Sequence, residues 1–218
     1  MITLLVVLLL SYLLGSIPTS LLVVRIISGL DIREHGSGNA GATNVYRLLG
    51  IGPAVVVGLI DVGKGVLAAL VVSHLQVGAP APVSTVLLQL LAGGAAVIGH
   101  VWTVFAGFRG GKGIATAVGA LAGIMPVAVA TTALVWLILL LSVRIMSVAS
   151  MGAAIVLPVS VWIWESGQEG AAAREMIWFT VGLAALILIT HRRNIGRLLR
   201  GKENRLGRVT PNTEEPVR

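Results

Sequence analysis

The sequence predicts an all-α, polytopic integral membrane protein. Of its 218 residues 56% are hydrophobic and only 11% are charged, and the mean hydropathy is +0.94. Soluble domains carry about 25% charged residues, so this composition fits a bilayer better than water. It also argues against a disordered chain, and the absence of cysteine argues against a disulfide-stapled domain or a Cys-ligated metal site.

Seven apolar segments are expected to form the transmembrane helices, one of them short. A bilayer core requires about 20 helical residues. Segment 1–30 is an apolar run with Arg25 near its end, and it lacks the basic start and cleavage site of a secretory signal. It is therefore predicted to be the first span.

The other segments follow in order. Segment 50–75 is predicted to span although it contains Asp61 and Lys64, which either pair or line a cavity. Segment 114–125 is too short to span alone, so it forms a half-helix or joins its neighbour beyond Pro126. Further spans are expected at 85–105, 127–142, 147–164 and 176–190, giving one transmembrane domain over 1–208 and a polar, flexible tail over 209–218.

The charges predict an outside N-terminus and a cytoplasmic C-terminus. In that orientation only Arg174 of the 16 Lys and Arg residues lies outside, and Lys64 lies within a span. Because Lys and Arg collect on the cytoplasmic side, the net charge of +7 reflects topology and gives no reason to expect nucleic acid. The cytoplasmic stretches then hold Arg25, Arg33, Arg47, Arg109, Lys112, Arg144 and the basic tail.

Two glycine-rich stretches on the predicted cytoplasmic side are suited to binding phosphate. Backbone N–H groups of glycine-rich loops form anion sites. In the first stretch a helix start near Thr43 or Asn44 adds its positive end to such a site, and Arg47 lies one turn further on. The alternatives are an ordinary capping loop and a basic turn between spans. The first stretch contains Ser37, Gly38, Asn39, Gly41, Thr43 and Asn44; the second contains Gly110, Gly111, Lys112 and Gly113, and lacks the first glycine and the Ser or Thr of a P-loop.

A third polar cluster begins the basic tail. At helical spacing His191, Asn194 and Leu198 share one face, where a neutral histidine and an amide can meet a substrate. The alternative is a stop-transfer anchor on anionic lipid. Ser147 and Ser150 either donate to an anion or cap a helix. Together the clusters are compatible with a transferase acting on a lipidic and a water-soluble phosphate compound.

The three clusters resemble, in order and spacing, the motifs of the PlsY family of bacterial acyl-phosphate:glycerol-3-phosphate acyltransferases. The first matches from Ser37 to Asn44, and the second from Gly99 and His100 through the Gly-Gly-Lys-Gly run to Thr116. Thr103 departs from the family, which usually has proline there. The third motif is matched by His191, Asn194, Arg197, Leu198, Gly201 and Glu203.

The resemblance implies transfer of a fatty acyl group from acyl phosphate to the 1-hydroxyl of glycerol 3-phosphate, in the cytoplasmic (inner) membrane and without metal or cofactor. The product is lysophosphatidic acid, an early phospholipid precursor, and the soluble enzyme that makes acyl phosphate is a candidate partner. Arg47, Lys112, His191 and Asn194 are expected to hold glycerol 3-phosphate. Acyl phosphate is expected to be bound by Ser37, Gly38, Asn39, Gly41, Thr43, Asn44, Gly110, Gly111, Gly113, Ser147 and Ser150.

The expected catalytic residues are Ser37, Lys112, His191 and Asn194. Ser37 has no Asp–His pair in the sequence to activate it, so direct attack by the substrate hydroxyl is the simpler scheme. The proton then passes to a substrate phosphate or to His191. A phosphometabolite transporter is the main rival, but it should show related halves with matching broken helices. A scaffold protein would leave the glycine-rich loops unexplained.

Overall fold

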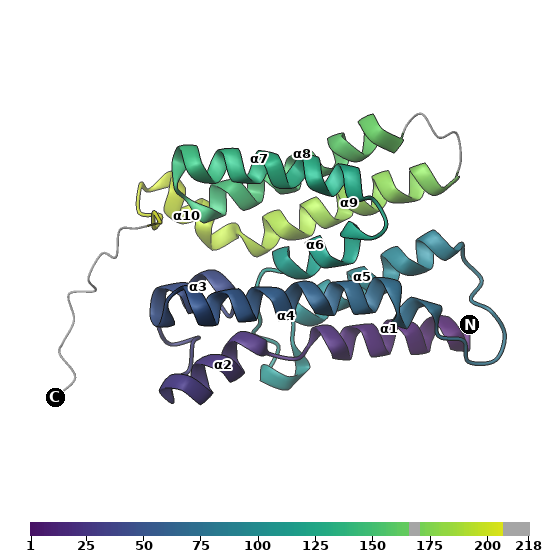
Figure 1. Cartoon of the computed structure of the whole chain (residues 1–218), viewed down its shortest axis with the longest axis horizontal. Coiled ribbons are helices and arrows are strands. Elements are labelled where there is room, and N and C mark those ends of the chain that lie inside the picture. The colour runs from purple at the N-terminus through teal and green to yellow at the C-terminus, as the bar shows by residue number, and fades with distance from the viewer. Residues whose placement is uncertain (166–170, 207–218) are drawn as a thin grey trace.

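The computed structural model describes residues 1–165 and 171–206, and every regular element in that part of the chain is helical (Figure 1). The expected tail over 209–218 lies outside the described residues. The α-helices are α1 (Ile2–Gly15), α2 (Thr19–Ser28), α3 (Ala42–Leu49), α4 (Ile51–Leu70), α5 (Thr85–Val101), α6 (Ile114–Ala122), α7 (Pro126–Val143), α8 (Met146–Glu165), α9 (Ala171–Thr190) and α10 (Arg192–Leu199), with short 3-10 turns η1 (Val72–His74) and η2 (Val104–Ala106).

Six helical stretches in the described part of the chain are long and apolar enough to cross a membrane. Short α6 is not among them, because its nine residues make about 14 Å of helix against a bilayer core of about 30 Å. It forms a separate helix before Pro126, as the half-helix alternative predicted. Residues 107–113 and α6 together lead from the end of α5 back to the start of α7 (Figure 1), so this segment returns the chain across the bundle although α6 alone is too short to span. The six stretches are Ile2–Ser28, Ile51–His74, Thr85–Ala106, Pro126–Val143, Met146–Trp164 and Ala171–Thr190.

The first span is broken, which the sequence analysis did not predict. The helix stops after Gly15 and resumes at Thr19. Pro18 has no backbone N–H and cannot continue the helical hydrogen bonding of the preceding turn. The freed carbonyl of Ser16 accepts a hydrogen bond from the hydroxyl of Thr103. Thr103 thus fastens the end of α5 to the break.

Small residues seat α6 tightly against α4. A Cβ on Gly65 would collide with the backbone of Thr116 and lie 2.6 Å from the Ala120 nitrogen, and a Cβ on Gly119 would collide with the Val62 carbonyl. Glycine at helix contacts allows backbones in a membrane to approach closely. These two glycines therefore fix the position of α6, and with it the glycine-rich loop that precedes it.

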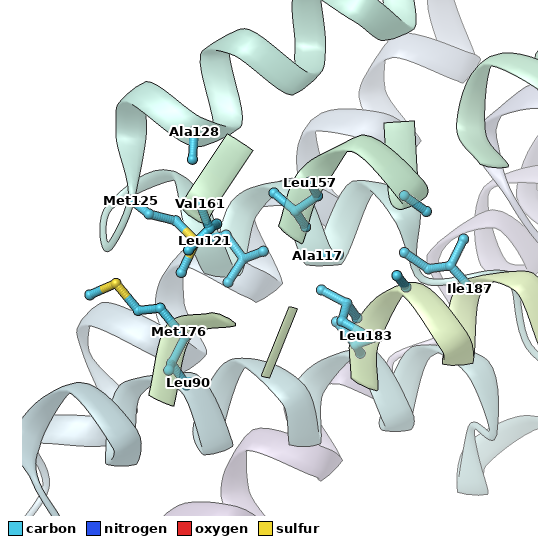
Figure 2. Close-up of a cluster of buried hydrophobic side chains, with 13 residues drawn as sticks. Leu90, Ala117, Leu121, Met125, Ala128, Leu157, Val161, Met176, Leu183 and Ile187 are labelled. Carbon is cyan, nitrogen blue, oxygen red and sulfur yellow. The ribbon is translucent and has the colours of Figure 1, made fainter. Parts of the chain in front are cut away.

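The largest buried apolar cluster joins α5 to α9 (Figure 2). Its members include Leu90, Leu121, Met125, Val161 and Leu183, each no more than 5% exposed. This cluster holds the short helix among four long ones. Large apolar side chains elsewhere, such as Trp178 at 73% exposure, face outward, as expected for a surface that lipid covers.

One expected boundary was wrong, because the last span begins at Ala171 and not at 176. The end of α8 at Glu165 is within one residue of the expected position. Residues 166–170, between α8 and α9, lie outside the described residues. Figure 1 shows α2, α3 and α10 gathered at the end of the bundle away from the N-terminus. The polar motifs belong to this end.

Candidate functional site

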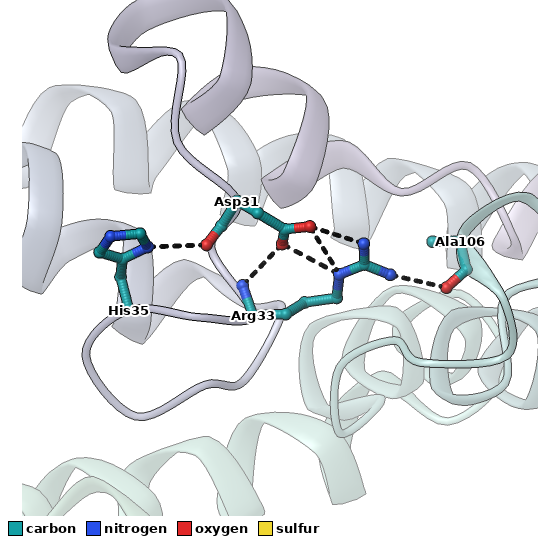
Figure 3. Close-up of polar contacts among 4 residues, drawn as sticks. All are labelled: Asp31, Arg33, His35 and Ala106. Carbon is teal, nitrogen blue, oxygen red and sulfur yellow. Dashed lines mark hydrogen bonds and ion pairs between the residues drawn. The ribbon is translucent and has the colours of Figure 1, made fainter.

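The first glycine-rich stretch lies in loop 1, residues 29–41. Arg33 and Asp31 form a close ion pair in this loop, with 2.6 Å between Nη2 and Oδ2. The Arg33 side chain also donates to the Ala106 carbonyl at 2.9 Å, which docks loop 1 on η2 (Figure 3). Hydrogen bonding to Arg33 is the largest influence on the Asp31 carboxyl and lowers its pKa to about 2. Sequence analysis missed this role because both residues look like ordinary loop charges.

Asn44 holds loop 1 together from inside. Its Oδ1 accepts from the Ser37 N–H at 2.9 Å, and its Nδ2 donates to the carbonyls of Ile32 and His35 at 3.2 and 3.0 Å. The residue is 1% exposed. The loop backbone thus uses both ends of the amide, and a place for Asn44 among the acyl-phosphate ligands stays a prediction.

Loop 1 leads into α3 at Ala42, one residue before the expected start. Within the described part of the chain the Ser37 hydroxyl has no hydrogen-bond partner. No base is therefore in place to activate it there. The other expected ligands of loop 1, Gly38, Asn39, Gly41 and Thr43, lie in the same loop and at its junction with α3.

The second glycine-rich stretch lies in loop 2, residues 107–113, between η2 and α6. The N–H groups of Gly110 and Gly111 donate to the carbonyls of Val101 and His100 at 3.1 and 3.0 Å. Carbonyls at the end of α5 therefore accept both of these N–H groups, and a role of Gly110 and Gly111 in binding acyl phosphate stays a prediction. The Lys112 and Gly113 N–H groups have no such partner among the described residues, and Gly113 starts α6 with φ +83°.

Three distant segments meet around Lys112. Its Nζ donates to Asn194 Oδ1 at 2.5 Å, across 82 positions of sequence. Asn194 Nδ2 donates to Glu203 Oε1 at 2.5 Å. The same carboxylate accepts from Ser147 Oγ at 2.8 Å and from Arg197 Nε at 2.6 Å. Loop 2, the start of α8 and the segment around α10 are thereby joined.

Glu203 is at the centre of this hydrogen-bond network, and the sequence analysis assigned it no role. Burial raises its pKa, but hydrogen bonds from Arg197, Asn194 and Ser147 outweigh burial, and the net shift is downward. The carboxylate therefore stays charged. Ser147, an expected acyl-phosphate ligand, uses its hydroxyl on Glu203, while Ser150 is buried in the next turn of α8. The sequence signal that could have identified Glu203 was an acidic residue shortly after Asn194 in an otherwise basic segment.

The charges around Lys112 are mainly positive. Burial is the largest influence on its pKa and lowers it, attraction to Glu203 opposes that shift, and repulsion by Arg197 and Arg47 adds to it, so that the pKa is about 8. Burial also lowers the pKa of Arg47, and Arg197 adds to that shift. Three basic groups thus lie close enough to influence one another, and a single carboxylate offsets their charge. An excess of about two positive charges suits a phosphate dianion.

His191 lies beside this group, is 2% exposed and is neutral near pH 7. Burial, followed by repulsion from Lys112, lowers its pKa to about 4. Its Nδ1 faces the Ile187 carbonyl at 2.8 Å, so in a neutral ring Nδ1 carries the proton. The other nitrogen, Nε2, is left with a lone pair and can accept a hydrogen bond from a hydroxyl.

The family model described as glycerol-3-phosphate acyltransferase matches residues 5–201. Among curated relatives, the glycerol-3-phosphate acyltransferase of Pelodictyon phaeoclathratiforme is 44% identical, with 94% of this chain and 97% of the relative covered. The corresponding protein of Chlorobaculum tepidum is 42% identical, with the same coverage.

Two solved structures are also similar to this chain. The crystal structure of PlsY (YgiH), an integral membrane glycerol 3-phosphate acyltransferase, in its glycerol 3-phosphate form has a TM-score of 0.81 and 35% identity, covering 94% of this chain and 96% of that one. Its lysophosphatidic acid form has a TM-score of 0.78 and 33% identity, covering 94% and 95%. By family match, identity and fold, the chain belongs to the glycerol-3-phosphate acyltransferase family, PlsY.

Proposed function

We propose that this protein transfers a fatty acyl group from acyl phosphate to the 1-hydroxyl of glycerol 3-phosphate. The observation that carries the proposal is the basic group formed by Lys112, Arg47 and Arg197 beside two glycine-rich loops, in which Asn194 holds Lys112 and Glu203 holds Arg197. Relatives named for this activity and a structure in a glycerol 3-phosphate form support the acceptor. A structure in a lysophosphatidic acid form supports the product.

In the proposed reaction the hydroxyl oxygen attacks the acyl carbonyl carbon, and the bond from that carbon to the phosphate oxygen breaks. Lysophosphatidic acid and inorganic phosphate leave. The hydroxyl proton passes to a phosphate oxygen of either substrate or to His191 Nε2. Acyl phosphate is a mixed anhydride and is already activated, so the scheme requires no cofactor.

Each residue has a role that follows from its charge and neighbours. Arg47 and Lys112 bind the phosphate of glycerol 3-phosphate, and Asn194 holds the Lys112 ammonium in place. His191 Nε2 accepts a hydrogen bond from a glycerol hydroxyl. The open part of loop 1 around Ser37, together with the Lys112 and Gly113 N–H groups, binds the acyl-phosphate group and stabilises charge on the carbonyl oxygen.

Ser37 is assigned a positioning role, because its hydroxyl lacks an activating base among the described residues. Incubation with acyl phosphate alone, followed by mass spectrometry of the intact protein, tests this role. Direct attack predicts unmodified protein. A kinetically competent acyl group on Ser37 would establish a covalent route instead.

The proposed location is the bacterial inner membrane, with the N-terminus outside and the site facing the cytoplasm. The gathering of α2, α3 and α10 at one end of the bundle and the one-sided basic charge support it. A cytoplasmic site is accessible to a soluble enzyme that supplies acyl phosphate, which we propose as a transient partner.

The activity is tested with purified protein, acyl phosphate and labelled glycerol 3-phosphate in detergent micelles. Labelled lysophosphatidic acid is expected, and Lys112→Ala should reduce its formation by about 100-fold or more because a charge at the phosphate is lost. The same mixture with acyl-CoA in place of acyl phosphate tests the donor. Uptake of label into protein-containing vesicles without acylation would replace the enzyme by a transporter.

A further inference from the structure

Two charged side chains lie buried inside α4. Asp61 and Lys64 are one turn apart, and each side chain is 3% exposed. Lys64 Nζ donates to Asp61 Oδ1 at 2.8 Å, so of the two arrangements open from sequence, pairing is the one found. Replacing a buried ion pair by well-packed apolar residues is often neutral or stabilising. Stability alone therefore does not account for this pair.

Lys64 reaches beyond its partner to the break in the first span. Its Nζ also donates to the Ile17 carbonyl at 2.5 Å. Ile17 lies between α1 and α2, where Pro18 interrupts the helical hydrogen bonds. The same carbonyl also accepts from the Thr19 N–H at 2.9 Å, so Lys64 adds a second hydrogen bond to a carbonyl that lies outside the regular helix. Lys64 thereby holds the break against α4.

Asp61 reaches in the other direction, toward loop 2. Its Oδ1 lies 3.7 Å from His100 Nδ1. On the far edge of the ring, a Cβ on Gly111 would collide with His100 Nε2 and lie 2.6 Å from the Ala40 carbonyl oxygen. The Gly111 N–H also donates to the His100 carbonyl at 3.0 Å. Gly111 is thus seated on His100, and Lys112 is the next residue.

A small cavity lies where the break, loop 1 and loop 2 meet. Its lining includes Ile17, Ala40, His100 and Gly111. Side-chain packing is therefore incomplete on this side of loop 2. Beside this cavity, the hydrogen bond from the Gly111 N–H to the His100 carbonyl and the contact with the His100 ring keep Gly111 in place.

We propose that Asp61, Lys64 and His100 are positioning residues for glycerol 3-phosphate binding. They connect the break in the first span to loop 2 and so hold the Lys112 backbone at the distance from α10 that places its ammonium at the phosphate. The role assigned to Lys112 rests on the proposed function. None of the three residues contacts the reacting groups in this scheme.

The test replaces the ion pair by apolar residues of similar size, Asp61→Leu/Lys64→Met. We expect a folded protein in micelles with a thermal midpoint close to that of the wild type. Its Kd and KM for glycerol 3-phosphate should rise about 10- to 100-fold, since a small misplacement of binding groups has effects of that size. The matched control is Thr180→Val, which alters a buried polar residue whose hydroxyl bonds only its own helix.

Kd is measured by calorimetry without acyl phosphate, and KM by the acylation assay. A folded double variant with wild-type Kd and KM would overturn the positioning role while leaving the proposed function intact. A wild-type protein without acylation activity would instead overturn the proposed function.

If the double variant does not fold, the calorimetric Kd of His100→Asn for glycerol 3-phosphate tests the positioning role instead. That change keeps a polar group facing Asp61 but removes the ring edge against Gly111. A raised Kd supports the proposal and an unchanged Kd overturns it. Failure of both variants to fold also overturns it, because the network would then serve folding only.

Discussion

Lys112 is a half-buried cation whose direct side-chain partner is the neutral amide oxygen of Asn194. Burial lowers its pKa to about 8, so the ammonium form needed for phosphate binding is present below that pH and is lost above it. We expect kcat/KM for glycerol 3-phosphate to fall about tenfold per pH unit above pH 8, because this ratio reports the free enzyme. Initial rates from about pH 6 to about pH 10 test this.

Lys112→Arg serves as the control for that profile, because a guanidinium stays protonated throughout this range. Its absolute activity will differ, since the two side chains are not equivalent, but the fall above pH 8 should disappear. An unchanged fall in the arginine variant would assign the titration to another group.

Glu203 accepts hydrogen bonds from Ser147, Asn194 and Arg197, and its side chain is 5% exposed. Glu203→Gln must turn an amide NH₂ toward one of these donors. We expect a loss of about 3 kcal/mol in unfolding free energy, as for other broken buried pairs. Exposed Glu34→Gln is the control and should change stability by no more than about 0.5 kcal/mol. Thermal denaturation in micelles measures both.

The stability lost in Glu203→Gln should depend on pH, and the direction of the Glu203 pKa shift says how. The folded-state pKa of Glu203 is below its ordinary value, so its stabilisation is present above the ordinary pKa and disappears as pH falls through the folded-state value. The difference between wild type and Glu203→Gln should therefore shrink on acidification. A difference independent of pH would contradict a role for the charge.

At the scale of elements, the approach of loop 2 to the end of α5 requires glycine at position 111. Gly111→Ala places a methyl group against His100 and the Ala40 carbonyl. We expect acylation activity to fall about 100-fold, because the displaced loop carries Lys112. Gly182→Ala in α9 is the control: a Cβ there meets nothing within 4 Å, and activity should be retained. Steady-state acylation assays on both variants test this prediction. Full activity of Gly111→Ala would contradict it.

Short α6 shows how one element depends on its neighbours. It is too short to span, but Gly65 and Gly119 seat it against α4 and the buried cluster around Leu121 covers its other side. Loop 2 is therefore carried by a helix that has little freedom to move. A rigid support of this kind holds binding groups more accurately than a loop alone.

At the scale of the whole molecule, the proposed orientation makes opposite predictions for the two ends of the bundle. The native chain has no cysteine, so single cysteines report location directly. In intact cells an impermeant maleimide should label Gln76→Cys between α4 and α5 and should not label Lys202→Cys after α10; both native residues are exposed. Permeabilised cells, in which both label, are the control. The reverse pattern would invert the topology.

Much of this architecture was predictable because the relevant signals are local. Span length and hydropathy located the six long helices, and the helix starts expected near Thr43 or Asn44 and at 114 lie within a residue or two of the starts of α3 and α6. The break at Pro18 was missed because apolar residues continue on both sides and only the interrupted backbone reveals it. The contacts of Asn44 within loop 1 were missed because an amide in a polar loop looks the same whether it faces the loop or a ligand.

The sequence by itself determined that this is a membrane protein, where its helices lie, and that three polar motifs could bind phosphate, since composition and helical spacing are properties of short segments. Only the tertiary structure decided which donors remain free. In it the Gly110 and Gly111 N–H groups donate to carbonyls of α5, and Lys112, Asn194, Glu203 and Ser147 form one hydrogen-bond network. The physical reason is that a hydrogen bond or buried ion pair depends on which distant segments pack together, and no local pattern contains that information.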